Sequence, residues 1–199
     1  STWASSTAFL TPCDVISAFP WTEGFEVTSP TLACLRVIDG NADTYTWGVS
    51  TSNARTGAQC AAMYTDVSTS NNDYLITPRL ALDATAKRLT FWTRARSAAE
   101  PDEISIRVST TGTNLPDFSN VVMASMPVAN TTYQKVTVDL SVFAGSNIYI
   151  AFVRNAAPAN GWYLYVDDIT VENTPLDLPD LVTLHSPASS SAQVGTGTV

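Results

Sequence analysis

The stretch Asn147-Ile148-Tyr149-Ile150-Ala151-Phe152-Val153 is the part of the chain that most clearly indicates its fold. Successive residues of an extended chain point to opposite faces, so this run is apolar on both of its faces. A strand that is apolar on both faces is typical of the middle of a sheet. We therefore predict a central strand over residues 147–153.

Other segments on both sides of this stretch also have strand character. Residues 104–108 and 136–140 alternate apolar and polar side chains, with the period of a half-buried strand. Residues 89–93 and 162–166 are rich in the aromatic and β-branched residues that favour strands. No long stretch has the 3.6-residue period of a helix. The turn signals between these segments lie at residues 111–114, 144–147 and 157–161. This spacing predicts an all-β fold, either a sandwich or a jelly roll.

The composition limits the kinds of partner that the chain can bind. The 199 residues are 45% hydrophobic, enough for a real core, and only 14% are charged, with a formal net charge of −8. Nucleic acids and anionic membranes select clustered Lys and Arg, so neither is expected as a partner. No apolar run approaches the ~20 residues of a membrane helix, so we expect no membrane insertion. The net negative charge suits a secreted or surface protein that binds cations or neutral ligands.

The two ends of the chain differ from its body. We predict a β-jelly-roll domain over residues 13–173, preceded by a Ser- and Thr-rich lead segment at residues 1–12. Residues 174–199 are rich in Pro and Ser and predict a linker or the truncated start of a following domain. The first residues contain neither the basic nor the apolar region of a signal peptide, so we expect any such peptide to be already gone.

The three cysteines, Cys13, Cys34 and Cys60, allow at most one internal disulfide. They are either buried free thiols or a single bridge plus one thiol, and the residues alone do not select the pair. With no Cys-x-x-Cys pair and one histidine in the chain, a zinc site is not expected.

A second informative stretch is the loop that contains Asp39, Asn41 and Asp43. These three oxygen-bearing side chains alternate around Gly40, and a hard cation such as Ca²⁺ prefers carboxylate and amide oxygens from a tight turn. The alternative is a solvated turn, since Asp, Gly and Asn are common turn formers. A complete EF-hand loop is excluded, because Thr44 stands where Gly is needed and Ser50 where the bidentate Glu is needed.

Several short motifs, taken together and in order, resemble the cleaved adhesin family. These are MAM-like jelly-roll domains of Bacteroidetes surface proteins, including the adhesin regions of gingipains. The resemblance covers about residues 13–173. The motifs are Phe19-Pro20-Trp21-Thr22-Glu23-Gly24-Phe25-Glu26, Ile38-Asp39-Gly40-Asn41 with Trp47, Asn72-Asp73-Tyr74-Leu75-Ile76-Thr77-Pro78, Leu89-Thr90-Phe91-Trp92, Ser109-Thr110-Thr111-Gly112-Thr113-Asn114 with Asp117-Phe118, and Tyr163-Leu164-Tyr165-Val166-Asp167-Asp168-Ile169-Thr170-Val171.

The resemblance implies a galactose-binding-like jelly roll with structural calcium, which serves as a non-catalytic module. Glu26, Asp39 and one or both of Asp167 and Asp168 match acidic positions that bind calcium or brace its loop. Neighbouring residues of a strand point to opposite faces, so we expect one of the last two, Asp168, to reach the ion. Residues 40–43 replace a more aspartate-rich run of the family. The full set of expected metal ligands is Glu26, Asp39, Asn41, Asp43, Asp167 and Asp168.

Catalysis is poorly supported by the residues of the chain. Asp102 and Glu103 follow a proline in an apparent loop and form the kind of carboxylate pair found in glycosidases, but a solvated acidic turn is the favoured explanation. His185 is the only histidine and lies in the tail outside the domain, so Ser/His and Cys/His catalysis are not expected.

The aromatic residues are the second candidate for a site. They can form a platform for a sugar or a protein partner, or fill the core. We select Trp162 and Tyr163 as ligand-binding residues, because Trp162 follows the turn Ala159-Asn160-Gly161 and so lies near a loop rim. The other aromatic candidates are Trp47, Trp92 and Tyr165.

These observations together predict a calcium-stabilised binding or adhesion module of a bacterial secreted or cell-surface protein. Its ligand would be a host or matrix protein or a glycan, and the module would be monomeric within a longer chain. Two alternatives remain open. One is a spacer that presents a neighbouring domain, and the other is a carbohydrate-binding module of a larger glycan-degrading enzyme.

Overall fold

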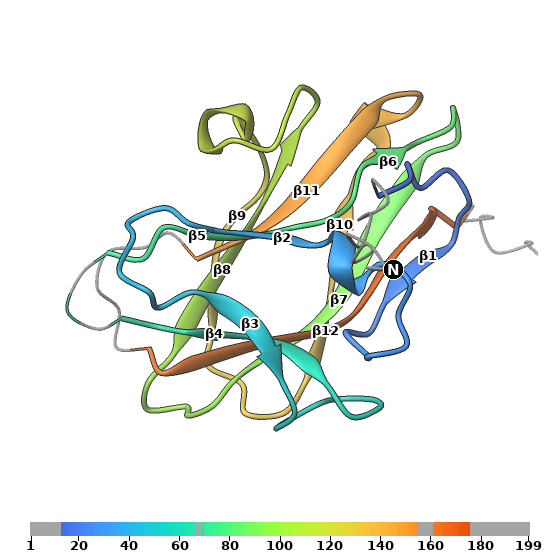
Figure 1. Ribbon diagram of the computed structural model, residues 1–199. Coiled ribbons are helices and arrows are strands. Elements are labelled where there is room, and N and C mark those ends of the chain that lie inside the picture. The colour runs from blue at the N-terminus through green and yellow to red at the C-terminus, as the bar shows by residue number, and fades with distance from the viewer. Residues whose placement is uncertain (1–12, 67, 69, 155–160, 176–199) are drawn as a thin grey trace, which may run out of the picture.

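The computed structural model describes residues 13–66, 68, 70–154 and 161–175, and shows two antiparallel sheets packed face to face (Figure 1). The first sheet has the order β10-β7-β12-β4-β3, with β1 paired to β12. Its strands are β1 (Trp21–Glu23), β3 (Trp47–Ser50), β4 (Cys60–Tyr64), β7 (Lys87–Ala95), β10 (Gln134–Asp139) and β12 (Tyr163–Asn173).

The second sheet has the order β2-β5-β11-β8-β9, with β6 paired to β11. Its strands are β2 (Arg36–Asp39), β5 (Asp73–Ile76), β6 (Leu80–Ala81), β8 (Asp102–Ser109), β9 (Asn120–Val128) and β11 (Asn147–Arg154). The described helices are single 3-10 turns, namely η1 (Leu32–Cys34), η2 (Leu115–Asp117) and η3 (Ser141–Phe143). The prediction of an all-β jelly-roll sandwich is confirmed, with residues 147–153 lying in the central strand β11.

The core lies between the two sheets and is built by every second side chain of their strands. Phe91 of β7 and Phe152 of β11 meet edge to face across it, with ring centroids 5.1 Å apart. Leu89, Met63 and Ile106 are fully buried in the same cluster. Large apolar side chains therefore hold the sheets together. On the outer face of β5 and β11 a second buried cluster forms, which Phe118 covers.

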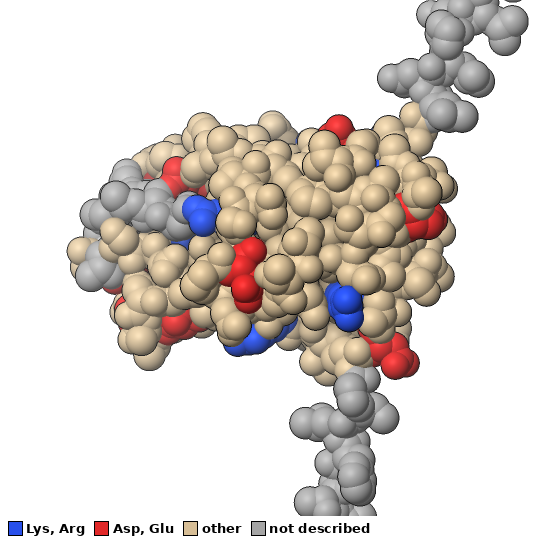
Figure 2. Space-filling model, turned by 90° about the horizontal axis from the view of Figure 1, so that it is seen from above, with Lys and Arg blue, Asp and Glu red and all other residues tan. Residues whose placement is uncertain are grey.

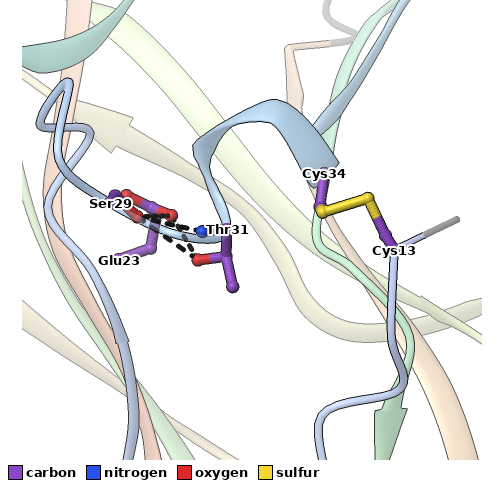
Figure 3. The surroundings of a disulfide bond; sticks show 5 residues. All are labelled: Cys13, Glu23, Ser29, Thr31 and Cys34. Atoms are coloured by element: carbon purple, nitrogen blue, oxygen red, sulfur yellow. Dashed lines mark hydrogen bonds between the residues drawn. A yellow bond between two sulfur atoms is a disulfide. The ribbon is translucent and has the colours of Figure 1, made fainter. Parts of the chain in front are cut away.

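One disulfide joins Cys13 to Cys34, and Cys60 is a buried free thiol. This selects the single-bridge alternative. Close to the bridge, the buried carboxylate of Glu23 accepts hydrogen bonds from the hydroxyls of Ser29 and Thr31 at 2.7 and 2.6 Å (Figure 3). The bridge and Glu23 together fix the segment between β1 and η1.

Asp102 and Glu103 lie at the start of β8, so the prediction that they occupy a loop is wrong. Asp102 is buried and accepts a hydrogen bond from Nε of Arg154 at 3.0 Å, while Glu103 accepts one from Nη1 of the same guanidinium at 3.0 Å. Because Arg154 is fully buried, it requires opposite charge beside it. Asp102 and Glu103 therefore have a structural role, in which they balance the buried positive charge of Arg154.

Among the described residues no helix is long and apolar enough to cross a membrane. The expected roles of residues 1–12 and 174–199 stay predictions, because residues 1–12 and 176–199 lie outside the described part of the chain.

Candidate functional site

The six expected metal ligands fall into two groups at opposite ends of strand β3. Asp39 ends β2, and Asn41 and Asp43 belong to the loop between β2 and β3. The other three carboxylates, Glu26, Asp167 and Asp168, contact residues 55–59 of the loop that follows β3. The first group therefore lies at the loop before β3, and the second group stabilises the loop after it.

The first loop is closed largely by its own hydrogen bonds. The carboxylate of Asp39 accepts from the backbone N–H of Asp43 at 3.2 Å and of Thr44 at 2.9 Å. Asp43 accepts from the N–H of Tyr45 at 2.7 Å and from the amide of Asn41 at 2.7 Å. The same amide donates to the carbonyl of Ser70 at 2.7 Å. These contacts give Asp39, Asn41 and Asp43 the turn-forming role that Asp and Asn often take.

A fourth polar residue, Asp73, adjoins this loop and was missed by the sequence reasoning. Asp73 opens β5 directly opposite Asp39 in the β2–β5 register and is fully buried. Its Oδ2 accepts from the N–H of Asn72 at 3.1 Å, whereas its Oδ1 is buried without a hydrogen-bond partner in the described structure. A buried carboxylate oxygen without a donor is costly. The available signal was an acidic residue at the start of an otherwise apolar strand.

Burial, and to a smaller extent the nearby charges of Asp39 and Asp43, raise the pKa of Asp73 to about 6. The hydroxyl of Thr46 opposes this rise in pKa from close by, although it does not form a well-directed hydrogen bond with the carboxylate. The three carboxylates have the oxygen chemistry of a calcium site. In the described part of the chain, however, no three acidic, His or Cys side chains are already grouped around one ion position.

The second group of carboxylates binds the backbone of the β3–β4 loop. Asp167 accepts from the N–H of Arg55 at 2.7 Å and of Thr56 at 3.3 Å. Asp168 forms an ion pair with Arg55, with Nη1 and Oδ2 at 2.6 Å. The expectation that Asp167 and Asp168 point to opposite faces is wrong, because both contact this one loop. The register shifts between Asp167 and Thr170, and the positive φ of 48° at Asp168 marks the bulge.

Glu26 completes the support of this loop from the other side. Its Oε1 accepts from the N–H of Ala58 at 2.8 Å and of Gln59 at 3.0 Å. Gly57 directly precedes these partners with a φ of 63°, and a Cβ at this position would lie 2.1 Å from Oε1. The loop can therefore close on Glu26 because residue 57 has no side chain.

The outer face of β4 and β12 carries a row of four tyrosines, which we call the tyrosine row: Tyr45, Tyr64, Tyr163 and Tyr165. Tyr64 and Tyr163 are directly opposite in the β4–β12 register, and their ring centroids are 4.8 Å apart. Tyr45 lies 5.0 Å from Tyr64, and Tyr165 lies 5.9 Å from Tyr163. Tyr45 is 42% and Tyr64 36% exposed, whereas Tyr165 is buried. The exposed half of the row is available to a ligand.

The tyrosine row borders two hollows. A groove of about 430 Å³ lies toward β3, and a smaller hollow of about 260 Å³ lies toward Trp162. Tyr64 lines both of them. The groove is lined by Thr46, Gly48, Val49, Ser50, Thr51, Ala62, Tyr64 and Tyr163. The smaller hollow is lined by Tyr64, Thr65, Glu100, Gly161 and Trp162.

The two residues selected from sequence as ligand contacts, Trp162 and Tyr163, each line one hollow. The guanidinium of Arg96 lies over the Trp162 ring at 3.6 Å from its centroid and covers one face of it. Tyr45 and Tyr64 were not selected from sequence. Tyr64 joins the row through the pairing of β4 with β12, and Tyr45 joins it by contact with the Tyr64 ring.

The remaining aromatic candidates pack within the domain and contribute to its stability. Trp47 is buried and its indole N–H donates to the carbonyl of Asp73 at 3.3 Å. Trp92 is half-buried beneath Arg55, whose guanidinium carbon is 3.6 Å from the ring centroid.

Charge is sparse on the surface of the molecule. In the face shown in Figure 2, acidic and basic side chains are few and interspersed. Several basic side chains are engaged by acids, such as Arg88 with Glu172 at 2.7 Å and Arg55 with Asp168. This pattern differs from the clustered cations that a polyanion requires.

The two antiparallel sheets packed face to face define the chain as a β-sandwich domain. The chain belongs to the cleaved adhesin domain family, whose family model matches residues 20–171. The resemblance noted from sequence is thereby confirmed.

The curated relatives that this chain matches are much longer proteins. Hemagglutinin A of Porphyromonas gingivalis is 25% identical over 162 residues, covering 68% of this chain. The chain spans about 7% of the length of that relative.

Solved structures share the fold. The K1 cleaved adhesin domain of Lys-gingipain from Porphyromonas gingivalis W83 superposes with a TM-score of 0.65 and 23% identity, covering 79% of this chain and 100% of that domain. TmCBM61, solved with beta-1,4-galactotriose, has a TM-score of 0.51 and 21% identity, covering 76% of this chain and 94% of that structure. At these identities the likeness concerns the fold alone.

Proposed function

We propose that this domain is a non-catalytic adhesion module of a secreted or cell-surface bacterial protein, with a host protein or a glycan as its ligand. The observation that carries this proposal is the open groove beside the tyrosine row, on a sheet face that the core does not use. Exposed aromatic side chains are the usual anchors of binding surfaces. The carboxylates that suggested catalysis, Asp102 and Glu103, are both bound to Arg154.

The location and the larger context follow from two further observations. The disulfide between Cys13 and Cys34 suits an oxidising compartment outside the cytoplasm. Hemagglutinin A is many times longer than the matching segment, which favours one module within a longer chain.

The proposal includes structural calcium at the loop that precedes β3. Asp39, Asp43 and Asp73 would hold the ion, with Asn41 beside them, after an adjustment of the loop that brings their oxygens together. The supporting observation is the buried Oδ1 of Asp73, which has no donor in the described structure and is near two other carboxylates. A bound cation would supply the missing positive charge. Glu26, Asp167 and Asp168 contact residues 55–59 at the other end of β3 from this loop, so we assign them to bracing the second loop.

The test of the adhesion function is a binding panel with the purified domain. Immobilised extracellular-matrix proteins, erythrocytes and a glycan array would be probed with labelled domain at micromolar concentration. We expect retention by at least one class of surface. A folded domain that binds none of these surfaces or glycans would favour the spacer alternative. Hydrolysis of an array glycan would contradict a non-catalytic module.

A carbohydrate-binding module of a glycan-degrading enzyme is the second candidate. Its support is the shared fold with TmCBM61, which was solved with beta-1,4-galactotriose. Binding to plant or microbial polysaccharides without binding to host surfaces would favour this candidate.

A further inference from the structure

We propose that the groove of about 430 Å³ beside the tyrosine row is a binding site for a neutral pyranose glycan. This inference deepens the proposed adhesion function and rests on it. The volume falls within the ~300–1,000 Å³ range of small-molecule sites, so the groove can hold a short oligosaccharide.

The position of the groove follows from strand alternation. Gly48 and Ser50 of β3, Ala62 and Tyr64 of β4, and Tyr163 of β12 share the face opposite to the buried core residues Met63 and Leu164. Gly48 is paired with Ala62 in the β3–β4 register, so two small residues form the floor. No atom lies within 4 Å of the position that a Cβ on Gly48 would occupy. The hollow is therefore open directly above this glycine.

The walls of the groove suit one face of a sugar ring. Tyr64 and Tyr163 present aromatic rings at its side, and Tyr64 is 36% exposed. One face of a pyranose carries mainly C–H bonds, which pack on the electron-rich face of an aromatic ring. Exposed tyrosine supplies this area at a low cost in side-chain entropy.

The rim of the groove suits the hydroxyl groups of the same ring. Thr46, Ser50 and Thr51 contribute hydroxyls to the lining, and each can both donate and accept a hydrogen bond. A few placed polar groups around an apolar wall are the usual means of orienting a ligand.

The ligand class is neutral because the lining of the groove contains no Lys, Arg, Asp or Glu. A sulfated or sialylated glycan would bring a negative charge to a chain of net charge −8 without a cation in the groove to bind it.

The neighbouring hollow indicates where a longer ligand would extend from the groove. Tyr64 lines both hollows, and Trp162 lines the second one with one ring face under Arg96. An oligosaccharide can therefore extend from the groove past Tyr64 toward Trp162. We expect a trisaccharide to bind more tightly than its monosaccharide.

The experiment titrates the domain with neutral gluco-, galacto-, manno- and xylo-oligosaccharides, with sulfated and sialylated glycans alongside. Gly48→Val adds bulk over the floor at a position where a Cβ meets no atom within 4 Å, and strands favour valine, so the variant should fold and lose binding. Tyr64→Ala removes the exposed ring, and we expect affinity to fall by about tenfold, the scale of a lost aromatic contact. Ala124→Val, at an exposed position of β9 in the other sheet, is the matched control and should bind like the wild type.

The outcomes separate this inference from the proposed function. Loss of neutral-glycan binding in Gly48→Val and Tyr64→Ala, with melting temperatures near that of the wild type, would support the site. Unchanged affinity in both variants, or binding to anionic glycans alone, would overturn it. Binding to matrix proteins but to no glycan would overturn the glycan site and leave the adhesion function standing. Absence of binding to any tested protein, cell or glycan would overturn both.

Discussion

At the scale of the residue, Asp73 is the side chain whose environment differs most from what its position in the sequence suggests. It follows a polar segment and opens a strand, yet it is fully buried next to the Asp39 loop. Its Oδ1 lacks a donor in the described structure, and burial raises its pKa to about 6. A buried acid of this kind destabilises the fold when it ionises, unless a cation balances its charge.

Replacing Asp73 by Asn tests this role. The folded-state pKa of about 6 lies above the ordinary value of 3.8, so the folded protein binds the additional proton. In EDTA the stability of the wild type should therefore decrease as the pH rises from about 4 to 6. Asp73→Asn should remove the part of this decrease that Asp73 contributes, whereas the part from Asp167, whose pKa burial also raises to about 6, should stay. Thermal melts across pH 4–8 measure the effect.

The calcium response of the same variant provides a second measurement. We expect the wild type in calcium to regain the stability lost on ionisation, and Asp73→Asn to respond much less. Asp14→Asn, at an exposed position, changes the net charge equally and should behave like the wild type. A calcium response of equal size in Asp73→Asn would show that the ion does not bind there.

At the scale of the element, polar side chains from one strand hold the loop or strand end of another. Asp167 and Asp168 of β12 and the nearby Glu26 bind the β3–β4 loop, and Arg154 at the end of β11 pairs with Asp102 at the start of β8. Asp102 also accepts from the N–H of Trp162 at 3.2 Å. The last of these contacts connects the buried ion pair to the rim of the proposed glycan site.

Asp102→Asn should destabilise the domain strongly. The change keeps the size of the side chain but leaves the guanidinium of Arg154 buried with less compensation, a loss of about 3–5 kcal/mol for a buried pair. Chemical denaturation measures the loss. Glu103→Gln is the matched control, because Glu103 contacts the same guanidinium and its side chain is 24% exposed, so its effect should be smaller. An equal loss of unfolding free energy in both variants would show that the burial of Asp102 does not determine its contribution to stability.

Reduction of the Cys13–Cys34 bridge should also lower stability. The two cysteines are 21 residues apart, and a cross-link of this span restricts the unfolded chain by about 3 kcal/mol. The variant Cys13→Ser, Cys34→Ser should therefore denature at a lower urea concentration than the wild type. A double variant with the wild-type midpoint would show that η1 is held by its other contacts, such as those of Glu23.

At the scale of the whole molecule, calcium should raise the stability of the sandwich. An ion that binds the folded form alone contributes about 2.7 kcal/mol at a hundredfold excess over its Kd. For a chain of this length that corresponds to a rise in melting temperature of roughly 5–10 °C. We expect EDTA to lower the melting temperature and calcium to restore it, whereas magnesium, which demands a stricter geometry, should restore less. An unchanged melt with no metal in elemental analysis would remove calcium from the proposal.

The fold was largely predictable because its signals are local. The period-two alternation at residues 104–108 and the fully apolar run at residues 147–153 both correspond to strands in the structure. The candidate site was predictable only in part. Trp162 and Tyr163 line the hollows, but Tyr64 joins them through the pairing of β4 with β12. No periodic pattern in the sequence specifies which strand lies beside which.

The sequence by itself determined the all-β class, the family and the loops rich in acidic residues, because alternation, turn residues and short motifs act over a few positions. Tertiary structure alone decided how these parts meet. It placed Arg55 against Asp168, 113 positions apart, and buried Asp73 beside Asp39. It also brought Tyr64 and Tyr163 together from two strands, although the two residues are nearly a hundred positions apart in the chain. The physical reason is that strand pairing and core packing depend on long-range loop closure and burial, which no local stretch of sequence encodes.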